Sequence, residues 1–193
     1  MRLRRCTRHS RVSRHFMDLS RFQNQTFDRG ASRIKELLWY LIRIPFFLWA
    51  IPLPSALRCW ILRCFGATVG SGVVIRSGVK IHFPWRLQMA DHVWIGEDVV
   101  ILSLDQVRIE TNVCISQGAF LCTGSHDFHS ESFDLITKPI AIESGSWVAA
   151  RCFVAPGVTI GSNSLCGAGA VIVKSVPANS KVFGNPAVIK PIS

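Results

Sequence analysis

The residue of this chain best suited to chemistry is His126, in the sequence Cys122-Thr123-Gly124-Ser125-His126-Asp127. An imidazole takes up and returns a proton near neutral pH, so histidine is a common general base in enzymes. His126 falls where a repeated part of the sequence ends and a long insertion begins, a junction well placed to open onto a cleft. The other histidines lack this context and are expected to face solvent: His9, His15, His82, His92 and His129.

The sequence on both sides of His126 follows a six-residue repeat. In the second half of the chain a core-type residue recurs at every sixth position: Ile142, Val148, Val154, Ile160, Cys166 and Ile172. Such spacing is typical of a β-helix, in which three hexapeptides make one triangular turn around a narrow core. The pattern predicts an all-β fold, a parallel β-helix of about five turns, formed by the blocks 69–86, 89–106, 109–126, 142–159 and 160–177.

Two further elements are expected outside the repeats. The gap at 127–139 predicts a loop that protrudes from the coil. The apolar segment 34–53 is interrupted by charged residues and prolines, whereas a membrane-spanning helix needs roughly twenty predominantly apolar residues. We therefore expect one or two helices packed on the coil or on another subunit, followed by a helix at about 55–65 that ends at Gly66.

The charge distribution divides the chain into three parts. Residues 1–16 contain six Arg and no acid, and without them the formal charge falls from +10 to +4. We interpret 1–16 as a disordered basic extension, 17–66 as an apolar helical segment and 67–193 as the coil. The positive charge lies largely in this extension and therefore does not indicate a nucleic-acid-binding surface on the folded part. Met17 is a second candidate for the start of the protein, because the patterned sequence begins there.

Cysteine usage and the N-terminal sequence bear on localisation. The chain contains seven Cys, none of them in a C-x-x-C pair. This usage is typical of a reducing compartment, where Cys fills the core as a small apolar residue. The spacing also predicts no metal site. Residues 1–16 lack the apolar stretch of a secretory signal, so we expect a cytoplasmic protein. Peripheral contact with the inner face of the membrane stays open, since four aromatic residues suit a headgroup boundary: Trp39, Tyr40, Trp49 and Trp60.

Several motifs together with the repeats carry a resemblance. They are Ser125-His126-Asp127, Lys138-Pro139-Ile140 and Phe183-Gly184-Asn185-Pro186-Ala187. With the hexapeptide coils they resemble the hexapeptide-repeat acyltransferases, in particular the galactoside and maltose acetyltransferase branch. The chain is more similar still to the colanic-acid biosynthesis acetyltransferase group, through motifs spread from about Met17 to the end: Phe65-Gly66-Ala67, His82-Phe83-Pro84-Trp85, Ile115-Ser116-Gln117-Gly118 and Phe133-Asp134-Leu135.

The resemblance implies a homotrimer of left-handed parallel β-helices with active sites between subunits. His126 would be the general base, and acetyl-coenzyme A (acetyl-CoA) would lie in a groove between adjacent coils. Matched positions imply cofactor contacts from Ala149, Ala150, Ala168, Val173, Lys174, Gly184, Asn185 and Pro186. The acceptor contacts that it implies are Asp98, Ser103, Asp105 and Asp127, with Glu131 and Asp134 as further polar candidates in the loop.

The activity implied is acetyl-CoA-dependent O-acetylation of a sugar hydroxyl in exopolysaccharide biosynthesis. The acceptor would be a sugar, a nucleotide sugar or a lipid-linked oligosaccharide. An N-acetyltransferase on an amino sugar and a non-catalytic β-helical scaffold stay open as alternatives. A γ-type carbonic anhydrase shares the β-helix but needs three zinc histidines, two of them five residues apart, whereas His126 and His129 are three apart.

Overall fold

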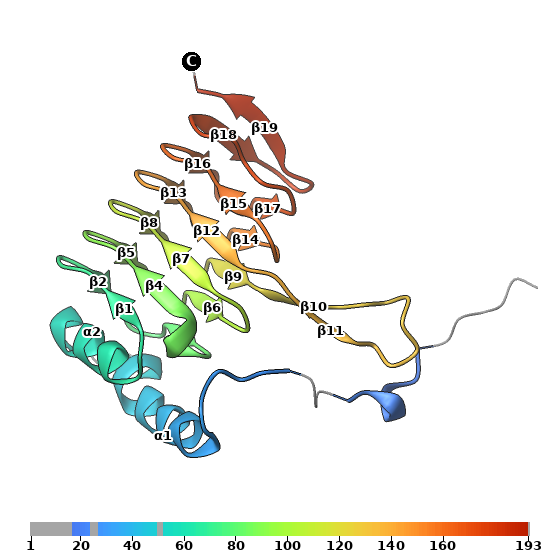
Figure 1. Ribbon diagram of the computed structural model, residues 1–193. Helices are drawn as coiled ribbons and strands as arrows, with labels where there is room; N and C mark the ends of the chain where they lie inside the picture. Colours follow the sequence, from blue (N-terminus) through green and yellow to red (C-terminus); the bar gives the residue numbers. More distant parts are fainter. Residues whose placement is uncertain (1–16, 24–26, 50–51, 193) are drawn as a thin grey trace, which may run out of the picture.

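The computed structural model describes residues 17–23, 27–49 and 52–192 (Figure 1). The predicted basic extension 1–16 therefore lies outside the described residues. The N-terminal part is helical, as expected; Figure 1 shows its two α-helices at one end of the coil and its first short helix beside the projecting hairpin. Its elements are the 3-10 helix η1 (Leu19–Arg21), α1 (Arg33–Arg43), the π-helical turn η2 (Ile44–Leu48) and α2 (Ser55–Cys64).

The remainder is a parallel β-helix whose short strands form three stacked sheets. The first sheet contains β1 (Thr68–Val69), β4 (Leu87–Met89), β7 (Val107–Ile109), β12 (Ile140–Ile142) and β15 (Thr159–Ile160), and the 3-10 helix η3 (Pro84–Arg86) precedes β4. The second contains β2 (Val74–Ile75), β5 (Trp94–Ile95), β8 (Cys114–Ile115), β13 (Trp147–Val148), β16 (Leu165–Cys166), β18 (Ser180–Phe183) and β19 (Val188–Pro191). The third contains β3 (Lys80–Ile81), β6 (Val100–Leu102), β9 (Phe120–Cys122), β14 (Phe153–Val154) and β17 (Val171–Ile172).

The coil has about six turns, which confirms the predicted architecture and adds a turn at its C-terminal end. Val176 bridges Ile160 in parallel, and β18 then pairs with β16. The Gly184 carbonyl next accepts a hydrogen bond from the Val171 N–H at 3.1 Å. The sixth turn is hard to recognise in the sequence because it departs from the six-residue spacing.

The core follows the repeat, because each hexapeptide turns one apolar side chain inward. From Ile75 to Ile172 these side chains are at most 2 % exposed. Cys166 occupies one such position, and burial raises the pKa of its thiol to about 12, as suits an inert apolar filler. Ser146 and Ser164 are also buried, and their hydroxyls donate to the carbonyls of Gly161 and Pro177, both at 2.9 Å. These two hydroxyls therefore tie the last three turns to one another through the interior.

Trp39 anchors the helical layer, which consists of α1, η2 and α2, to the coil. Its side chain has no exposed surface, and its indole N–H donates to the Ile81 carbonyl at 3.0 Å. The rings of Phe47 and Phe65 pack against it, with centroids at 5.3 and 5.1 Å. The helix predicted at about 55–65 is confirmed as α2. Among the described residues, no helix is both long and apolar enough to cross a membrane.

Candidate active site

The insertion that carries His126 is an antiparallel hairpin projecting from the side of the coil (Figure 1). It consists of β10 (Gly124–His126) and β11 (Leu135–Thr137), with His126 paired to Leu135. The protruding loop expected at 127–139 is thus present, but it leaves the coil earlier than the hexapeptide blocks indicated. The third turn ends with β9, so His126 belongs to the hairpin arm and lies clear of the stacked coils.

A backbone carbonyl holds the imidazole of His126. Its Nδ1 lies 2.8 Å from the carbonyl oxygen of Phe133. Since a carbonyl can only accept, this hydrogen bond requires a proton on Nδ1, so the neutral imidazole has its lone pair on Nε2. The Phe133 ring stacks on the imidazole, with centroids 4.2 Å apart and planes 2° from parallel. Phe133 also has φ +51°, a conformation uncommon for a bulky residue and often associated with functional sites.

The N-terminal segment reaches across to the hairpin and contacts His126 from another side. The Phe22 ring meets the imidazole edge-on, with centroids 5.6 Å apart. The Asp18 N–H donates to the Glu131 carbonyl at 2.9 Å, and the Arg21 guanidinium pairs with the Glu131 carboxylate at 2.7 Å. Exposed ion pairs are individually weak. The backbone hydrogen bond and the aromatic contact are therefore the main interactions that hold the N-terminal segment against the hairpin.

The carboxylates of the hairpin are engaged elsewhere than at the imidazole. Asp127 accepts from the backbone N–H of His129 at 2.8 Å, and Glu131 holds Arg21. Ser132 and Ser130 donate to Asp134, and these hydrogen bonds hold the pKa of the Asp134 carboxyl below its usual value. In the described contacts, a backbone carbonyl and no carboxylate orients His126.

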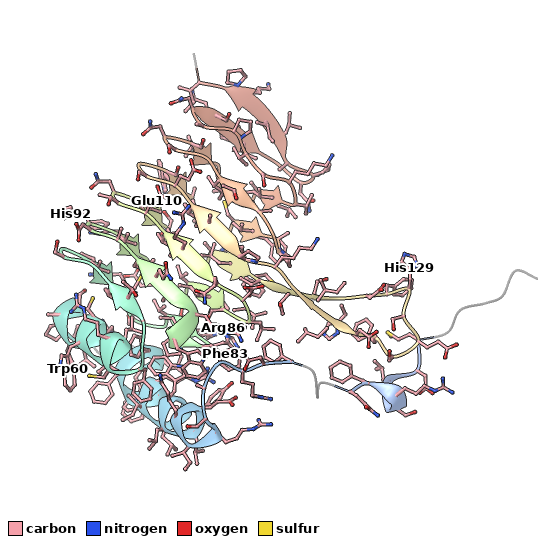
Figure 2. All side chains as sticks on the ribbon, viewed as in Figure 1. Trp60, Phe83, Arg86, His92, Glu110 and His129 are labelled. Atoms are coloured by element: carbon pink, nitrogen blue, oxygen red, sulfur yellow. The ribbon has the colours of Figure 1, made fainter. Side chains whose placement is uncertain are left out.

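A cavity of about 310 Å³ lies between this hairpin, η3 and the N-terminal segment. Leu135, the pairing partner of His126, is part of its wall. Figure 2 shows Arg86 and Phe83 at the foot of the hairpin, facing the N-terminal segment. The wall carries both hydrogen-bond donors and acceptors: Gln23, Phe27, Asp28, Arg86, Asp134, Leu135 and Thr137.

The predicted acceptor residues of the coil have unequal access to this region. Asp105 lies at the hairpin base, where its N–H donates to Thr123 Oγ1 at 3.0 Å. Asp98 is exposed at the corner between β5 and β6, a different edge of the coil. Ser103 has no exposed surface, and its hydroxyl both accepts from the N–H and donates to the carbonyl of Phe83, each at 3.0 Å. We therefore assign Ser103 a structural role in this chain.

Replacing Ser103 by Ala should destabilise the protein without changing acceptor recognition. The substitution leaves the buried Phe83 N–H without its acceptor, which costs about 1–3 kcal/mol, while the Phe83 carbonyl keeps its hydrogen bond from the Arg86 N–H. Chemical denaturation should show this loss, while KM for the acceptor stays as in wild type. A raised KM with unchanged stability would instead place Ser103 in the acceptor site.

The predicted cofactor residues form two groups. Val173, Lys174 and Pro186 line one cavity of about 290 Å³ at the C-terminal end of the coil. Ala149, Ala150 and Ala168 lie at the edge between the second and third sheets. The Ala150 carbonyl accepts from the Gly169 N–H at 2.9 Å, so this edge is continuous from one coil to the next. Gly184 and Asn185 are exposed at its C-terminal end.

Comparison with known proteins identifies the family. No family model matches the chain. The chain is 43 % identical over 172 residues to the provisionally named colanic acid biosynthesis acetyltransferase WcaF of Escherichia coli K12, a match that covers 89 % of this chain and 94 % of WcaF. The protein belongs to the hexapeptide-repeat acetyltransferases. Galactoside O-acetyltransferase of Escherichia coli K12 is a more distant relative, 29 % identical over 123 residues, which are 62 % of this chain and 61 % of that enzyme.

Solved structures of other acetyltransferases have the same fold as this chain. A hexapeptide-repeat acetyltransferase of Vibrio cholerae, complexed with acetyl-CoA, gives a TM-score of 0.77 at 24 % identity, covering 90 % of this chain and 97 % of that one. A galactoside acetyltransferase in complex with coenzyme A also gives 0.77, at 22 % identity and 92 % of each chain. These likenesses concern the fold, and they confirm the predicted left-handed parallel β-helix.

In the acetyltransferase, the predicted site residues do not converge within one chain. The hairpin with His126 leaves the corner between the third and first sheets, where Asp105 and Lys174 also lie. Asp98 and the alanines lie along the edge between the second and third sheets. The predicted site residues therefore form two groups on different edges of the triangular coil.

Some residues around His126 were not found from the sequence. The contact of Phe22 depends on a segment about one hundred residues distant in the chain. Phe133 was noted only as part of a family motif, although its carbonyl orients the base candidate. Among the described residues, no three His, Cys, Asp or Glu side chains are grouped so that they could hold a metal ion.

Proposed function

We propose that this acetyltransferase moves the acetyl group of acetyl-CoA to a sugar hydroxyl in exopolysaccharide biosynthesis, with His126 as general base. The observation that carries the proposal is the hydrogen bond between His126 Nδ1 and the Phe133 carbonyl. In the neutral imidazole it places the proton on Nδ1 and leaves the Nε2 lone pair to receive a proton, which is what a general base requires.

The chemistry would proceed by direct transfer. Nε2 of His126 takes the proton of the acceptor hydroxyl while the oxygen attacks the thioester carbonyl carbon. The carbon–sulfur bond then breaks, and the departing sulfur receives the proton from the imidazolium. Holding thioester and alcohol side by side removes much of the entropic cost of their encounter, and general-base assistance contributes about 10²- to 10⁴-fold.

The acetyl donor would lie along the C-terminal coils. Small side chains at Ala149, Ala150 and Ala168 let a pantetheine arm approach the backbone, and Lys174 is exposed beside a cavity where it can meet a phosphate. Gly184, Asn185 and Pro186 would close this groove at its end. Structures of a relative with acetyl-CoA and of a galactoside acetyltransferase with coenzyme A support this choice of donor.

The active enzyme would be a homotrimer. One chain carries His126 and the alanine edge on different sides of its prism, so neither half-site is complete alone. Rotation about a threefold axis parallel to the coil can bring the hairpin of one subunit to the alanine edge of the next. The exposed Trp94 and Trp147 of the second sheet would supply apolar area for such contacts.

The acceptor would bind next to the hairpin. The cavity beside Leu135 offers the Arg86 guanidinium and the carboxylates of Asp28 and Asp134 for sugar hydroxyls. Asp105 and Asp127 lie at the base and in the arm of the same hairpin. The named roles of WcaF in colanic acid biosynthesis and of galactoside O-acetyltransferase support a sugar acceptor.

The test is release of free thiol from acetyl-CoA by the purified protein over a panel of acceptors. The panel pairs each sugar with its amino-sugar analogue and includes nucleotide sugars and lipid-linked oligosaccharides. We expect release that depends on a hydroxyl acceptor, with the ester identified by mass spectrometry. Release only with amino sugars would replace the proposal by N-acetylation, and a folded protein that binds no acetyl-CoA would be a scaffold.

A further inference from the structure

The outer face of the helical layer exposes an apolar stripe. Five large aliphatic side chains of α1 and its C-terminal continuation recur at helical spacing and are between 44 % and 72 % exposed: Ile34, Leu37, Leu38, Leu41 and Ile44. The opposite face of α1 carries Trp39, which is already used to fasten the helix to the coil. A surface helix normally turns polar side chains outward, so this stripe requires a different explanation.

The stripe continues over the neighbouring helix. A cavity of about 380 Å³ opens between α1 and α2, and the residues of its wall are aliphatic, aromatic or Cys. Leu38 and Ile42 line it from α1, and Leu57 and Trp60 from α2. Figure 2 shows Trp60 at the outer surface of this layer. The apolar surface therefore spans both helices, which is larger than the scattered apolar side chains normal on a soluble protein.

The helical part of the described chain also has a net positive charge. Residues 17–66 contain seven Lys and Arg but only three of the 12 Asp and Glu, a formal charge of +4. Nine residues of each sign lie in 67–193, so the coil has no net charge. Arg33 and Arg43 stand at the two ends of the apolar stripe of α1.

We propose that this face of α1 and α2 docks on an anionic lipid bilayer, with α1 lying in the plane of the headgroups. Its 11 residues extend for only about 16 Å, which suits a helix that lies in the interface. The Leu and Ile side chains enter the acyl boundary, Trp60 lies at headgroup level, and the cations meet the lipid phosphates. A second copy of the chain fits less well, because a face-to-face contact brings two segments of net positive charge together.

The test is flotation of the purified full chain with vesicles, in the absence of acetyl-CoA and acceptor. Wild type should float with vesicles of phosphatidylcholine and phosphatidylglycerol, bind phosphatidylcholine vesicles much less, and lose binding as salt is raised. The double variant Leu37→Gln/Leu41→Gln should partition about a hundredfold more weakly, since each exposed Leu contributes more than a factor of ten on insertion.

The matched control is Val188→Gln/Ile192→Gln, which removes two exposed apolar side chains at the far end of the coil and should float as wild type does. Light scattering and circular dichroism should show that all three proteins share one mass and one fold. The proposal is overturned by wild type that does not float, by equal flotation of the Leu variant, or by a changed oligomeric mass in that variant. Because no step of the assay involves catalysis, its result is independent of the proposed function.

Discussion

Replacing His126 by Ala should lower kcat for acetyl transfer by about 10²- to 10⁴-fold, the contribution of a general base. The acceptor hydroxyl then loses the imidazole that receives its proton in the proposed mechanism and that the Phe133 carbonyl holds in place. Thiol release from acetyl-CoA, measured with a responsive acceptor at saturating concentrations, gives kcat directly. Binding of acetyl-CoA, followed by calorimetry, should stay at the wild-type value.

His129→Ala is the matched control, since it removes an exposed imidazole three residues further along the same hairpin (Figure 2). Its one described backbone bond, to Asp127, uses the main-chain N–H and survives the change. It should keep wild-type kcat. If His126→Ala instead lost acetyl-CoA binding or trimer assembly along with activity, His126 would be a structural residue and the proposed mechanism would be wrong.

Replacing Trp39 by Ala should destabilise the protein by about 3–5 kcal/mol, the usual cost of deleting a fully buried Trp. The change opens a cavity between Phe47 and Phe65 and leaves the buried Ile81 carbonyl without its donor. Urea denaturation at one fixed protein concentration measures the change in the free energy of unfolding.

Two companion variants separate the causes of that loss. Trp39→Phe keeps most of the ring contacts and should cost less than Trp39→Ala, mainly through the unpaired Ile81 carbonyl. Trp60→Ala removes an exposed Trp of the same layer and should change stability by no more than about 0.5 kcal/mol. A Trp39→Ala protein as stable as Trp60→Ala would show that the helices are not coupled to the coil through this residue.

The sequence by itself determined the coil and the position of the main chemical candidate. A hexapeptide repeat can bury its apolar residue only if every short strand turns one side chain inward, so five turns in register specify a β-helix. The insertion was equally visible, because it interrupts that register between Leu121 and Ile142. Family motifs then distinguished His126 from the other histidines.

Tertiary structure decided what surrounds His126. The contacts of Phe22 and the Phe133 carbonyl join residues whose proximity no local pattern encodes. Ser103 looked available for a substrate, but its hydroxyl is enclosed between two coils and bonded to Phe83. The sixth turn was missed since it is built from backbone pairing without the six-residue spacing.

The helical layer shows the same division most clearly. α1 is apolar on both sides, so its sequence predicted a helix but could not say which side would be buried. In the folded protein the face of α1 that carries Trp39 is buried, because the Trp39 indole fills the space above the coil and its N–H reaches the Ile81 carbonyl. The opposite apolar stripe was thereby left at the surface, since one helix face can contact the coil at a time.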